Sequence, residues 1–394
     1  MGAVSDPARD FGTYVHVPFC VARCDYCDFA TWTDRMHLVD DYVDACVADI
    51  SRRALEPSTT VFVGGGTPSL LPPPALARIL DAIERTPGAE VTVECNPDSV
   101  DAPKLAAYAE AGVNRVSIGV QSMRAHVLAE LGRTHDPENV ARAVDAARVA
   151  GIERVNVDLI YGTPGERVED WEATLDAALA LGPTHVSAYA LTVEPGTPLG
   201  AAVAAGTRAA PDDDDQALKY EIADDRLAAA GYEGYEISNW ARPGEECRHN
   251  LLYWRGGEYA GIGCAAHGHT RDRTTGASRR WWNVRTPERY VAGVGARRSV
   301  EAGAEVLDAP QTATERLVLG LRTRDGIKLD AARAEAPGMH DCLDALSDAG
   351  LLTRAGDHVT LTRRGRLLAN EVGARLLAAD EADALPVRQP SGTQ

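Results

Sequence analysis

The sequence predicts an α/β fold, a partial (β/α) barrel followed by a small winged-helix-like α+β domain. Short segments rich in Val and Ile alternate with amphipathic helical segments from Tyr14 to about Pro195, which is typical of parallel strands covered by helices. Polar residues gather directly after these strands, where barrels of this kind carry their chemistry. After Pro310 the pattern changes to helices and one short hairpin.

Six strands are expected in the barrel domain, which we place at residues 11–230. The expected strands are Tyr14–Phe19, Thr60–Gly64, Glu90–Glu94, Arg115–Gln121, Arg154–Tyr161 and His185–Thr192. The expected helices between them are Pro74–Thr86, Ala102–Ala111, Asn139–Ala150 and Val168–Ala180. Residues 196–230 are also expected to be helical, because the acidic run Asp212–Asp215 complements the dipole at a helix N-terminus.

The remainder of the chain is expected to hold a connecting region and a separate domain. The connecting region is placed at residues 231–309, in which residues 231–300 are rich in Gly, Trp, Tyr and Arg and predict loops with short strands. Residues 310–378 predict the winged-helix-like domain, with helices Thr314–Leu321, Leu329–Ala334 and Met339–Ala349, a hairpin of Leu351–Thr353 and His358–Leu361, and a closing helix Arg363–Ala378. Residues 1–10 are expected to be flexible and residues 379–394 to form a disordered tail.

The composition excludes several classes of protein. The chain has 394 residues, a net charge of −18, 45% hydrophobic residues and 25% charged residues, which is typical of a globular protein. The N-terminus has no signal-peptide pattern, and no run approaches the roughly 20 apolar residues of a membrane span, so a cytoplasmic protein is expected. Residues 310–378 have nearly balanced charges and no basic stripe, so nucleic-acid binding is not expected.

The strongest chemical signal is the segment Cys20-Val-Ala-Arg-Cys24-Asp-Tyr-Cys27, directly after the first expected strand. The other five cysteines are scattered, as isolated buried thiols usually are. Zinc sites usually draw four ligands from two separated pairs, and no second pair follows here. Three thiolates on one loop match three irons of a [4Fe–4S] cluster better. A three-ligand zinc site and redox-reactive thiols are the alternatives.

A second group of residues follows the later strands. Gly64–Pro68 comes after the second strand, and its three glycines allow a ligand to approach the backbone closely. Polar residues then stand near the ends of the next strands or shortly after them: Glu94, Gln121, Arg133 and Asp158. Singly, such residues are often helix caps. Together they are expected to surround one pocket, with a guanidinium for a carboxylate and carboxylates for hydroxyl and ammonium groups.

The CxxxCxΦC loop, in which Φ is aromatic, resembles the radical-SAM superfamily, whose fold is a partial (β/α) barrel. The resemblance implies that Cys20, Cys24 and Cys27 hold a [4Fe–4S] cluster and that the methionine end of S-adenosylmethionine (SAM) chelates its fourth iron. It also implies a set of cofactor-binding residues. These are Tyr14, Tyr26, Gly65, Gly66, Thr67, Glu94, Gln121, Arg133 and Asp158.

Further segments narrow the resemblance to one family. YVHVPFC, GGGTPS, ECNPDS, RVSIGVQS, GRTH and DLIYGTPG, together with residues 310–378, are similar to the oxygen-independent coproporphyrinogen III oxidases and the related HemW family of heme chaperones. The oxidases carry a fourth cysteine in CxxxCxFCxC, and Phe29 stands at that position here. The segment Arg248–Trp254 matches the HNxxYW motif that is associated with heme binding in the chaperones. Both features favour the chaperones.

Heme is therefore the expected ligand of the HNxxYW segment. Its candidate residues are His249, Asn250, Tyr253 and Trp254. An imidazole can ligate iron and aromatic faces can stack on a porphyrin, although such a cluster also occurs as simple packing. The rival axial ligands are Cys247, His267 and His269.

The resemblance implies a heme chaperone that delivers heme to acceptor proteins such as respiratory cytochromes. It implies peripheral membrane association through such partners and a monomer or homodimer. The alternatives are a radical-SAM oxidase of porphyrin biosynthesis, which decarboxylates porphyrinogen propionates, and a winged-helix regulator with a metal sensor. Phe29 disfavours an active coproporphyrinogen oxidase, but whether SAM is cleaved stays open, and no catalytic residue is assigned.

Overall fold

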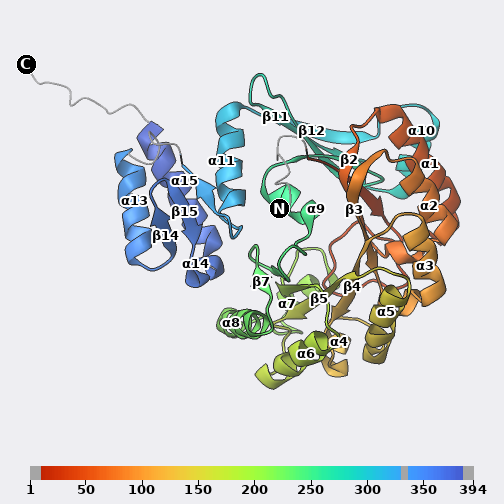
Figure 1. The fold of residues 1–394 in the computed structure, drawn as a ribbon, viewed down its shortest axis with the longest axis horizontal. Helices are drawn as coiled ribbons and strands as arrows, with labels where there is room; N and C mark the ends of the chain where they lie inside the picture. The colour runs from red at the N-terminus through yellow and green to blue at the C-terminus, as the bar shows by residue number, and fades with distance from the viewer. Residues whose placement is uncertain (1–9, 330–335, 385–394) are drawn as a thin grey trace, which may run out of the picture. The chain divides into compact units, whose positions relative to one another are not determined.

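The computed structural model describes residues 10–329 and 336–384 and forms two compact units. The large unit contains the described chain up to Gly234 together with Ser238–Tyr253 and Gly257–Leu307. The small unit contains the described chain from Asp308 and the short segments Tyr235–Ile237 and Trp254–Gly256. Figure 1 shows the two units in a ribbon drawing.

A single mixed sheet organises the large unit, and among the described residues it has 12 strands in the order β12-β11-β10-β9-β1-β2-β3-β4-β5-β6-β8-β7. The six strands that come first along the chain are parallel to one another. They are β1 Phe11–Val17, β2 Ser58–Gly65, β3 Arg85–Cys95, β4 Arg115–Gln121, β5 Arg154–Tyr161 and β6 His185–Ala190. Their Val-rich sequences are buried almost continuously, as in strands covered on both faces. The predicted partial barrel is confirmed.

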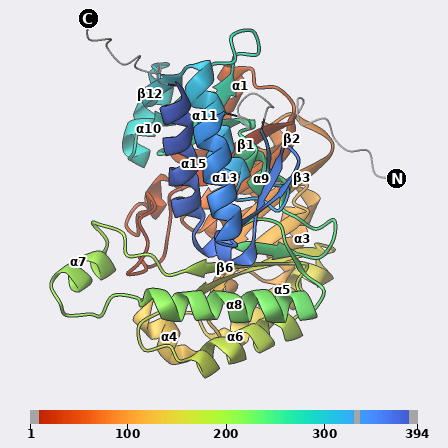
Figure 2. The same ribbon diagram turned by 90° about the vertical axis from the view of Figure 1, so that its left-hand side faces the viewer.

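Helices follow the parallel strands in the order expected for β/α units. They are α1 Val39–Arg53, α2 Pro73–Asp81, α3 Ala102–Glu110, α4 Ala125–Glu130, α5 Pro137–Val149, α6 Val168–Ala180, α7 Pro198–Ala204 and α8 Asp213–Ala229. Asp101, Asp136 and Asp212 cap the N-termini of α3, α5 and α8 with side-chain hydrogen bonds. Figure 2 shows α8 beside α6, and α8 also contacts β5 and β6.

Several boundaries in the first units differ from those expected, and two of the differences have a clear physical reason. The first strand ends at Val17 because Pro18 has no N–H to donate to the sheet. The second helix ends at Asp81, and not at Thr86, because Arg85 already begins the long strand β3.

The expected connecting region at 231–309 is corrected, because most of this segment belongs to the large unit and completes its sheet, although the expected short strands are present. It contributes β7 Glu233–Gly234, β8 Asn239–Ala241, β9 Glu258–Ile262, β10 His267–Arg271, β11 Ser278–Asn283 and β12 Glu301–Leu307, with helices α9 Arg248–Trp254 and α10 Pro287–Gly295. β9 lies parallel to β1, whereas β10, β11 and β12 are antiparallel.

The small unit is an α+β domain with a three-stranded sheet of order β13-β15-β14. Its described elements are α11 Ala309–Gly320, β13 Ile327–Lys328, α13 Pro337–Asp348, β14 Leu352–Ala355, β15 His358–Leu361, α14 Arg363–Leu367 and α15 Ala369–Ala384. Leu317, Met339, Leu343, Val359 and Leu376 are part of its core.

The helices of the C-terminal region differ in their bounds from those expected. The first helix begins at Ala309, before the expected Thr314, because Asp308 and Gln311 form a capping box. Most of the expected helix Leu329–Ala334 lies outside the described residues. The expected tail from Ala379 is corrected, because α15 continues to Ala384; residues 385–394 are outside the described part.

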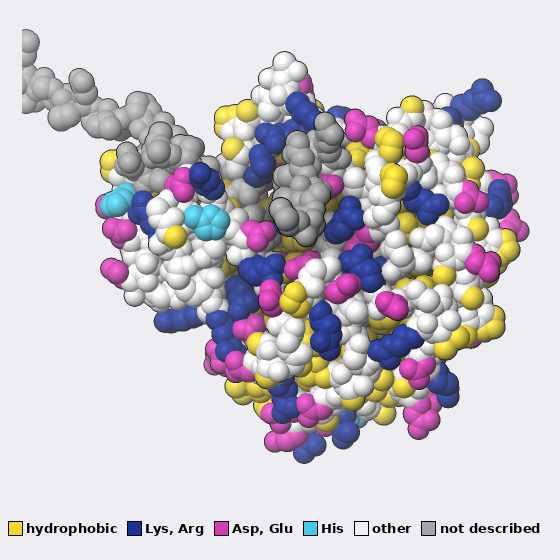
Figure 3. All heavy atoms as spheres, viewed as in Figure 1, with side chains coloured by type: hydrophobic (Ala, Val, Ile, Leu, Met, Phe, Trp, Pro, Cys, Tyr) yellow, Lys and Arg dark blue, Asp and Glu magenta, His cyan; other side chains and the backbone are white. Residues whose placement is uncertain are grey.

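The surface of the protein carries charges of both signs. Figure 3 shows acidic and basic side chains interspersed over the visible faces of both units. Within the described residues, none of the helices combines the length and the apolar character that crossing a membrane requires.

Candidate functional site

The three motif cysteines lie on the loop that follows β1. Both ends of this loop are held together, because Cys20 donates its N–H to the Trp32 carbonyl at 3.0 Å and Trp32 donates to the Pro18 carbonyl at 2.8 Å. Cys20 is buried, and Cys24 and Cys27 are half-buried. The loop therefore presents its thiols from a fixed backbone frame.

The glycine segment after β2 packs directly against the cysteine loop. Gly66 donates its N–H to the Val17 carbonyl at 2.7 Å, and Thr67 donates to the Phe19 carbonyl at 2.8 Å. A Cβ atom on Gly66 would lie 2.6 Å from the Phe19 oxygen and 3.1 Å from the Cys20 sulfur. Glycine is therefore required at this position, and the Thr67 hydroxyl then donates to the Cys20 sulfur at 3.6 Å.

Glu94 stands at the end of β3 and faces the glycine segment. Its carboxylate accepts the Gly65 N–H at 2.9 Å. Burial, reinforced by the nearby Asp158 carboxylate, raises the pKa of Glu94 to about 8. A cationic group bound beside Glu94 would favour its ionised form.

Arg133 connects the cysteine loop to β4. Its guanidinium donates to the Cys24 sulfur at 3.7 Å and to the Gly119 carbonyl at 2.7 Å. A Cβ atom on Gly119 would lie 3.1 Å from the Gln121 side-chain nitrogen and 3.2 Å from Arg133, so both side chains pass over this glycine. Among the described residues no partner accepts the buried Nε–H of Arg133.

Asp158 lies on β5 and is oriented by neighbouring strands. Its carboxylate accepts hydrogen bonds from Ser117 at 2.7 Å and from Asn156 at 2.8 Å. Burial raises the pKa of Asp158, and these hydrogen bonds oppose the increase. The carboxylate is thus fixed in position beside Glu94.

One cavity of about 420 Å³ collects these side chains at the carboxyl ends of the strands. The sequence-predicted residues that line it are Cys20, Cys24, Tyr26, Cys27, Gly65, Gly66, Thr67, Glu94, Gln121, Arg133 and Asp158. Tyr14 lies near Glu94, where its hydroxyl bonds to His16 at 3.1 Å and its ring stacks against Phe62. Tyr14 is not among the lining residues.

Sequence reasoning did not include several residues of this cavity. Lys104, Ser117, Phe29 and His135 also line it. His135 follows Arg133 by two residues in the GRTH segment, a proximity that could have indicated it. Ser117 could be found only from the structure, because it precedes the strand end by several residues and acts through Asp158.

The donor set of the cavity fits a cluster and SAM. Burial raises the pKa of the Cys20 thiol, and burial raises the pKa of the Cys27 thiol to about 11, so bound iron would be needed to hold both as thiolates. Thr67 and Arg133 aim hydrogen-bond donors at two of the sulfurs. Within the described residues, no three His, Cys, Asp or Glu side chains gather closely enough to hold one metal ion. This does not conflict with a [4Fe–4S] cluster, because each of its three cysteines binds a different iron.

The HNxxYW segment lies at the other ends of the strands, in α9. His249 is 1% exposed. Its Nδ1 bonds to the Thr60 hydroxyl at 2.8 Å, its Nε2 bonds to the Tyr253 hydroxyl at 2.8 Å, and its ring stacks on Phe62. Burial lowers the pKa of His249 to about 4, so the imidazole is neutral at pH 7.

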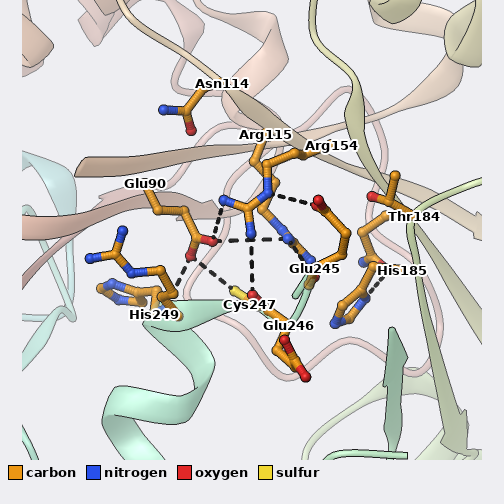
Figure 4. Close-up of polar contacts among 12 residues, drawn as sticks. Glu90, Asn114, Arg115, Arg154, Thr184, His185, Glu245, Glu246, Cys247 and His249 are labelled. Atoms are coloured by element: carbon orange, nitrogen blue, oxygen red, sulfur yellow. Dashed lines mark hydrogen bonds and ion pairs between the residues drawn. The ribbon is translucent and has the colours of Figure 1, made fainter. Parts of the chain in front are cut away.

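A buried charged cluster holds the chain just before α9 (Figure 4). Glu90 on β3 forms an ion pair with Arg154 at 3.1 Å and accepts the backbone N–H of His249 at 3.1 Å and the Cys247 thiol at 3.6 Å. Arg115 donates to the Glu245 carbonyl at 3.0 Å. These contacts anchor the 245–249 segment to three strands of the barrel.

The other candidate heme residues differ in accessibility. Tyr253 packs edge-on against Tyr259, with ring centres 4.6 Å apart. Asn250 lies in the same helix, and Trp254 belongs to the small unit. His269 is 8% exposed and bonds to the Gly257 carbonyl at 2.8 Å. Only His267 among the named rivals is exposed.

Comparisons with known proteins agree with this geometry. Family models for the radical SAM superfamily and the HemN C-terminal domain match residues 14–178 and 307–368. The chain is 45% identical to the heme chaperone HemW of Mycobacterium tuberculosis over 95% of this chain and 97% of that protein. It is 36% identical to the heme chaperone HemW of Escherichia coli over 93% and 97%. The structure of coproporphyrinogen III oxidase (HemN) from Escherichia coli shares the fold, with a TM-score of 0.78, 22% identity, and coverage of 95% and 91%.

Proposed function

The chain belongs to the HemW family of heme chaperones within the radical-SAM superfamily, and we propose on this basis that it binds heme and delivers it to acceptor proteins. The observation that carries the proposal is the similarity to these chaperones along nearly the whole chain, at 45% identity over 95% of its length. The likeness to the oxidase HemN concerns the fold, since only 22% of residues are identical.

Phe29 supports the chaperone function over the oxidase function. The oxidase pattern places a cysteine at this position, whereas Phe29 lines the cavity and is 58% exposed. A phenyl ring cannot supply the thiol chemistry of a cysteine. The chain therefore lacks one element of the oxidase pattern while keeping the three cluster cysteines.

The cluster and SAM belong to the cavity at the carboxyl ends of the strands. Cys20, Cys24 and Cys27 would hold the [4Fe–4S] cluster, whose fourth iron supplies a binding position for the methionine end of SAM. Glu94 and Asp158 would face the ammonium and ribose hydroxyl groups, and Arg133 would face the carboxylate. The buried Nε–H of Arg133, which has no acceptor in the described part of the chain, supports this last assignment.

The setting of the chaperone is also part of the proposal. Respiratory cytochromes would act as heme acceptors, and contact with such partners would bring the chain to a membrane surface. All eight cysteines are free, which suits a reducing compartment such as the cytoplasm. A monomer or a homodimer would be compatible with this role.

Two assays on the reconstituted protein test the proposal. In the first, heme is titrated into the protein and the loaded protein is mixed with an apo-cytochrome; we expect saturable binding followed by transfer. In the second, the protein is incubated with SAM, a reductant and coproporphyrinogen III; we expect no divinyl product. Formation of protoporphyrinogen would contradict the chaperone function and support the oxidase alternative.

A further inference from the structure

The heme ligand can be sought among the side chains that the structure leaves accessible. An axial ligand must bring a nitrogen or sulfur lone pair to the iron. His249 uses both ring nitrogens for hydrogen bonds inside the protein. Cys247 is buried against Glu90, and His269 is buried and bonds to the Gly257 carbonyl. In this conformation none of the three can reach a planar ligand as large as heme.

His267 differs from them in exposure and in bonding. It begins β10 and is solvent-exposed, and among the described residues no hydrogen bond involves its imidazole. Burial of part of the ring, with the nearby Arg280 charge, lowers the pKa of His267. The imidazole is therefore neutral near pH 7, which is the form that ligates iron.

An aromatic surface adjoins this imidazole. His267 pairs with Trp282 across β10 and β11, so both side chains lie on one face of the sheet. Their rings stack with centres 6.1 Å apart, and Trp282 is 37% exposed. A Cβ atom on Gly303 would lie 2.4 Å from the Trp282 ring, so the glycine in β12 makes room for the indole to lie flat.

The same face also carries positive charge. Arg280 precedes Trp282 by two residues in β11 and so projects to the same side of the sheet. Its guanidinium pairs with Glu305 at 2.6 Å and remains 37% exposed. Figure 3 shows basic side chains over the β11 region of the large unit. Heme propionates are carboxylates that a guanidinium binds well.

We propose that His267 is the axial ligand of the heme iron, with Trp282 stacking on the porphyrin and Arg280 pairing with a propionate. The proposal rests on the proposed function and specifies where its cargo binds. It assigns the HNxxYW histidine a different task. His249 anchors α9 to β2 and β3 through Thr60, Phe62 and Glu90, and so stabilises the sheet from which His267 projects.

Heme titration followed in the Soret region tests the ligand assignment in the full-length, cluster-loaded protein. For His267→Ala we expect a shifted Soret band and affinity lower by about tenfold or more, the loss of roughly one strong contact. His37→Ala is the matched control, because His37 is also an exposed histidine, and it should behave as the parent. His267→Met should bind heme with a third spectrum, because a thioether replaces the imidazole.

His249→Ala separates the anchor from the ligand. It should lower the melting temperature while the Soret band of the heme that still binds stays in the parent's position. Loss of the parent's Soret position in His249→Ala, with His267→Ala unchanged, would overturn the proposal. If the parent itself shows no saturable heme binding, the proposed function fails, which is a different result from an unchanged His267→Ala spectrum.

The propionate contact has its own test. Arg280→Gln should weaken heme binding several-fold and leave the binding of heme dimethyl ester unchanged, since the ester has no carboxylates. Equal losses for both ligands would contradict the Arg280 contact. Trp282→Leu removes the stacking surface and should weaken both ligands alike; unchanged affinity for both would contradict the stacking.

Discussion

Around the cysteine loop, Arg133 keeps a buried Nε–H without a partner among the described residues, and Glu94 is ionised only at a cost. At the opposite ends of the same strands, His249 has both ring nitrogens bonded, and the buried Glu90 carboxylate forms an ion pair with Arg154 at 3.1 Å, although its Oε2 atom accepts no hydrogen bond among the described residues. The difference lies in charge pairing, since neither Arg133 nor Glu94 forms an ion pair among the described residues. Buried charges are normally paired, so these two side chains indicate a place for a charged ligand. The ion-paired residues around Glu90 instead indicate a structural anchor, although they hold the histidine of the HNxxYW motif.

The most severe loss that we expect is that of the iron–sulfur cluster from the cavity. Replacing Cys20, Cys24 and Cys27 by alanine should abolish cluster assembly, because among the described residues Cys95 is the one other cysteine that lines the cavity, and a single thiol cannot hold the cluster. Anaerobic reconstitution of the parent should give about four irons per chain, measured with visible absorbance. Cys46→Ala is the matched control, since Cys46 is buried outside the cavity, and it should keep the iron. If the triple variant bound as much iron as the parent, these three cysteines would not be the ligands of the cluster.

The next effect lies in the anchor. Glu90→Ala leaves Arg115 and Arg154 without their buried carboxylate, which should lower the free energy of unfolding by about 3–5 kcal/mol. Glu245→Ala removes a 32% exposed partner of Arg154 and should cost less than about 1 kcal/mol. Urea unfolding of the unloaded proteins measures both. Equal stabilities for the two variants would mean that the ion pairs of Glu90 do not anchor the segment before α9.

How far the sequence predicts these two regions depends on how local their determinants are. Strands Arg115–Gln121 and Arg154–Tyr161 and helix Val168–Ala180 have the predicted bounds, because each is set by a local run of apolar residues. The cavity residues follow strands whose carboxyl ends meet at one edge, so their gathering could be inferred from parallel topology.

The region 231–309 could not be predicted in this way. Strand β9 pairs with β1, which lies far away in the sequence. In β10 and β12, glycines stand at Gly268 and Gly303, where an apolar side chain would be expected, because the rings of Trp281 and Trp282 fill the space that a side chain would need. The alternation that marks a strand is therefore lost. The burial of His249 was equally hidden, since its partner Thr60 lies 189 residues away.

A smaller effect is expected for the cavity arginine that donates to Cys24. Arg133→Ala should weaken SAM binding by about 1.5–3 kcal/mol, the value of a hydrogen bond to a charged group, without loss of cluster iron. Arg23→Ala is the matched control, because Arg23 also lines the cavity but is exposed, and its affinity should change less. Calorimetry of the cluster-loaded proteins measures both. An Arg133 variant with the parent's affinity would mean that its free Nε–H does not face the cofactor.

A pair of opposite pH slopes of stability is also expected in the protein without ligands. The pKa of Glu94 is raised to about 8 from a usual value near 4.5, so between these values the folded state binds more protons and stability falls as pH rises. Glu94→Gln should remove this loss, which is at most about 1.4 kcal/mol per pH unit. The melting temperature of the variant should therefore change less between pH 5 and pH 8 than that of the parent.

His249 should show the reverse sign. Its pKa is lowered to about 4 from a usual value near 6.5, so in this window the unfolded state binds more protons and stability falls as pH falls. His249→Gln should be less stable at pH 7, through lost packing, but should lose less stability than the parent on acidification. The same slope in variant and parent would mean that His249 is already charged when folded, which its two internal hydrogen bonds and near-complete burial oppose. Because Glu94 and His249 respond in opposite directions, one pH series distinguishes the open end of the barrel from the closed one.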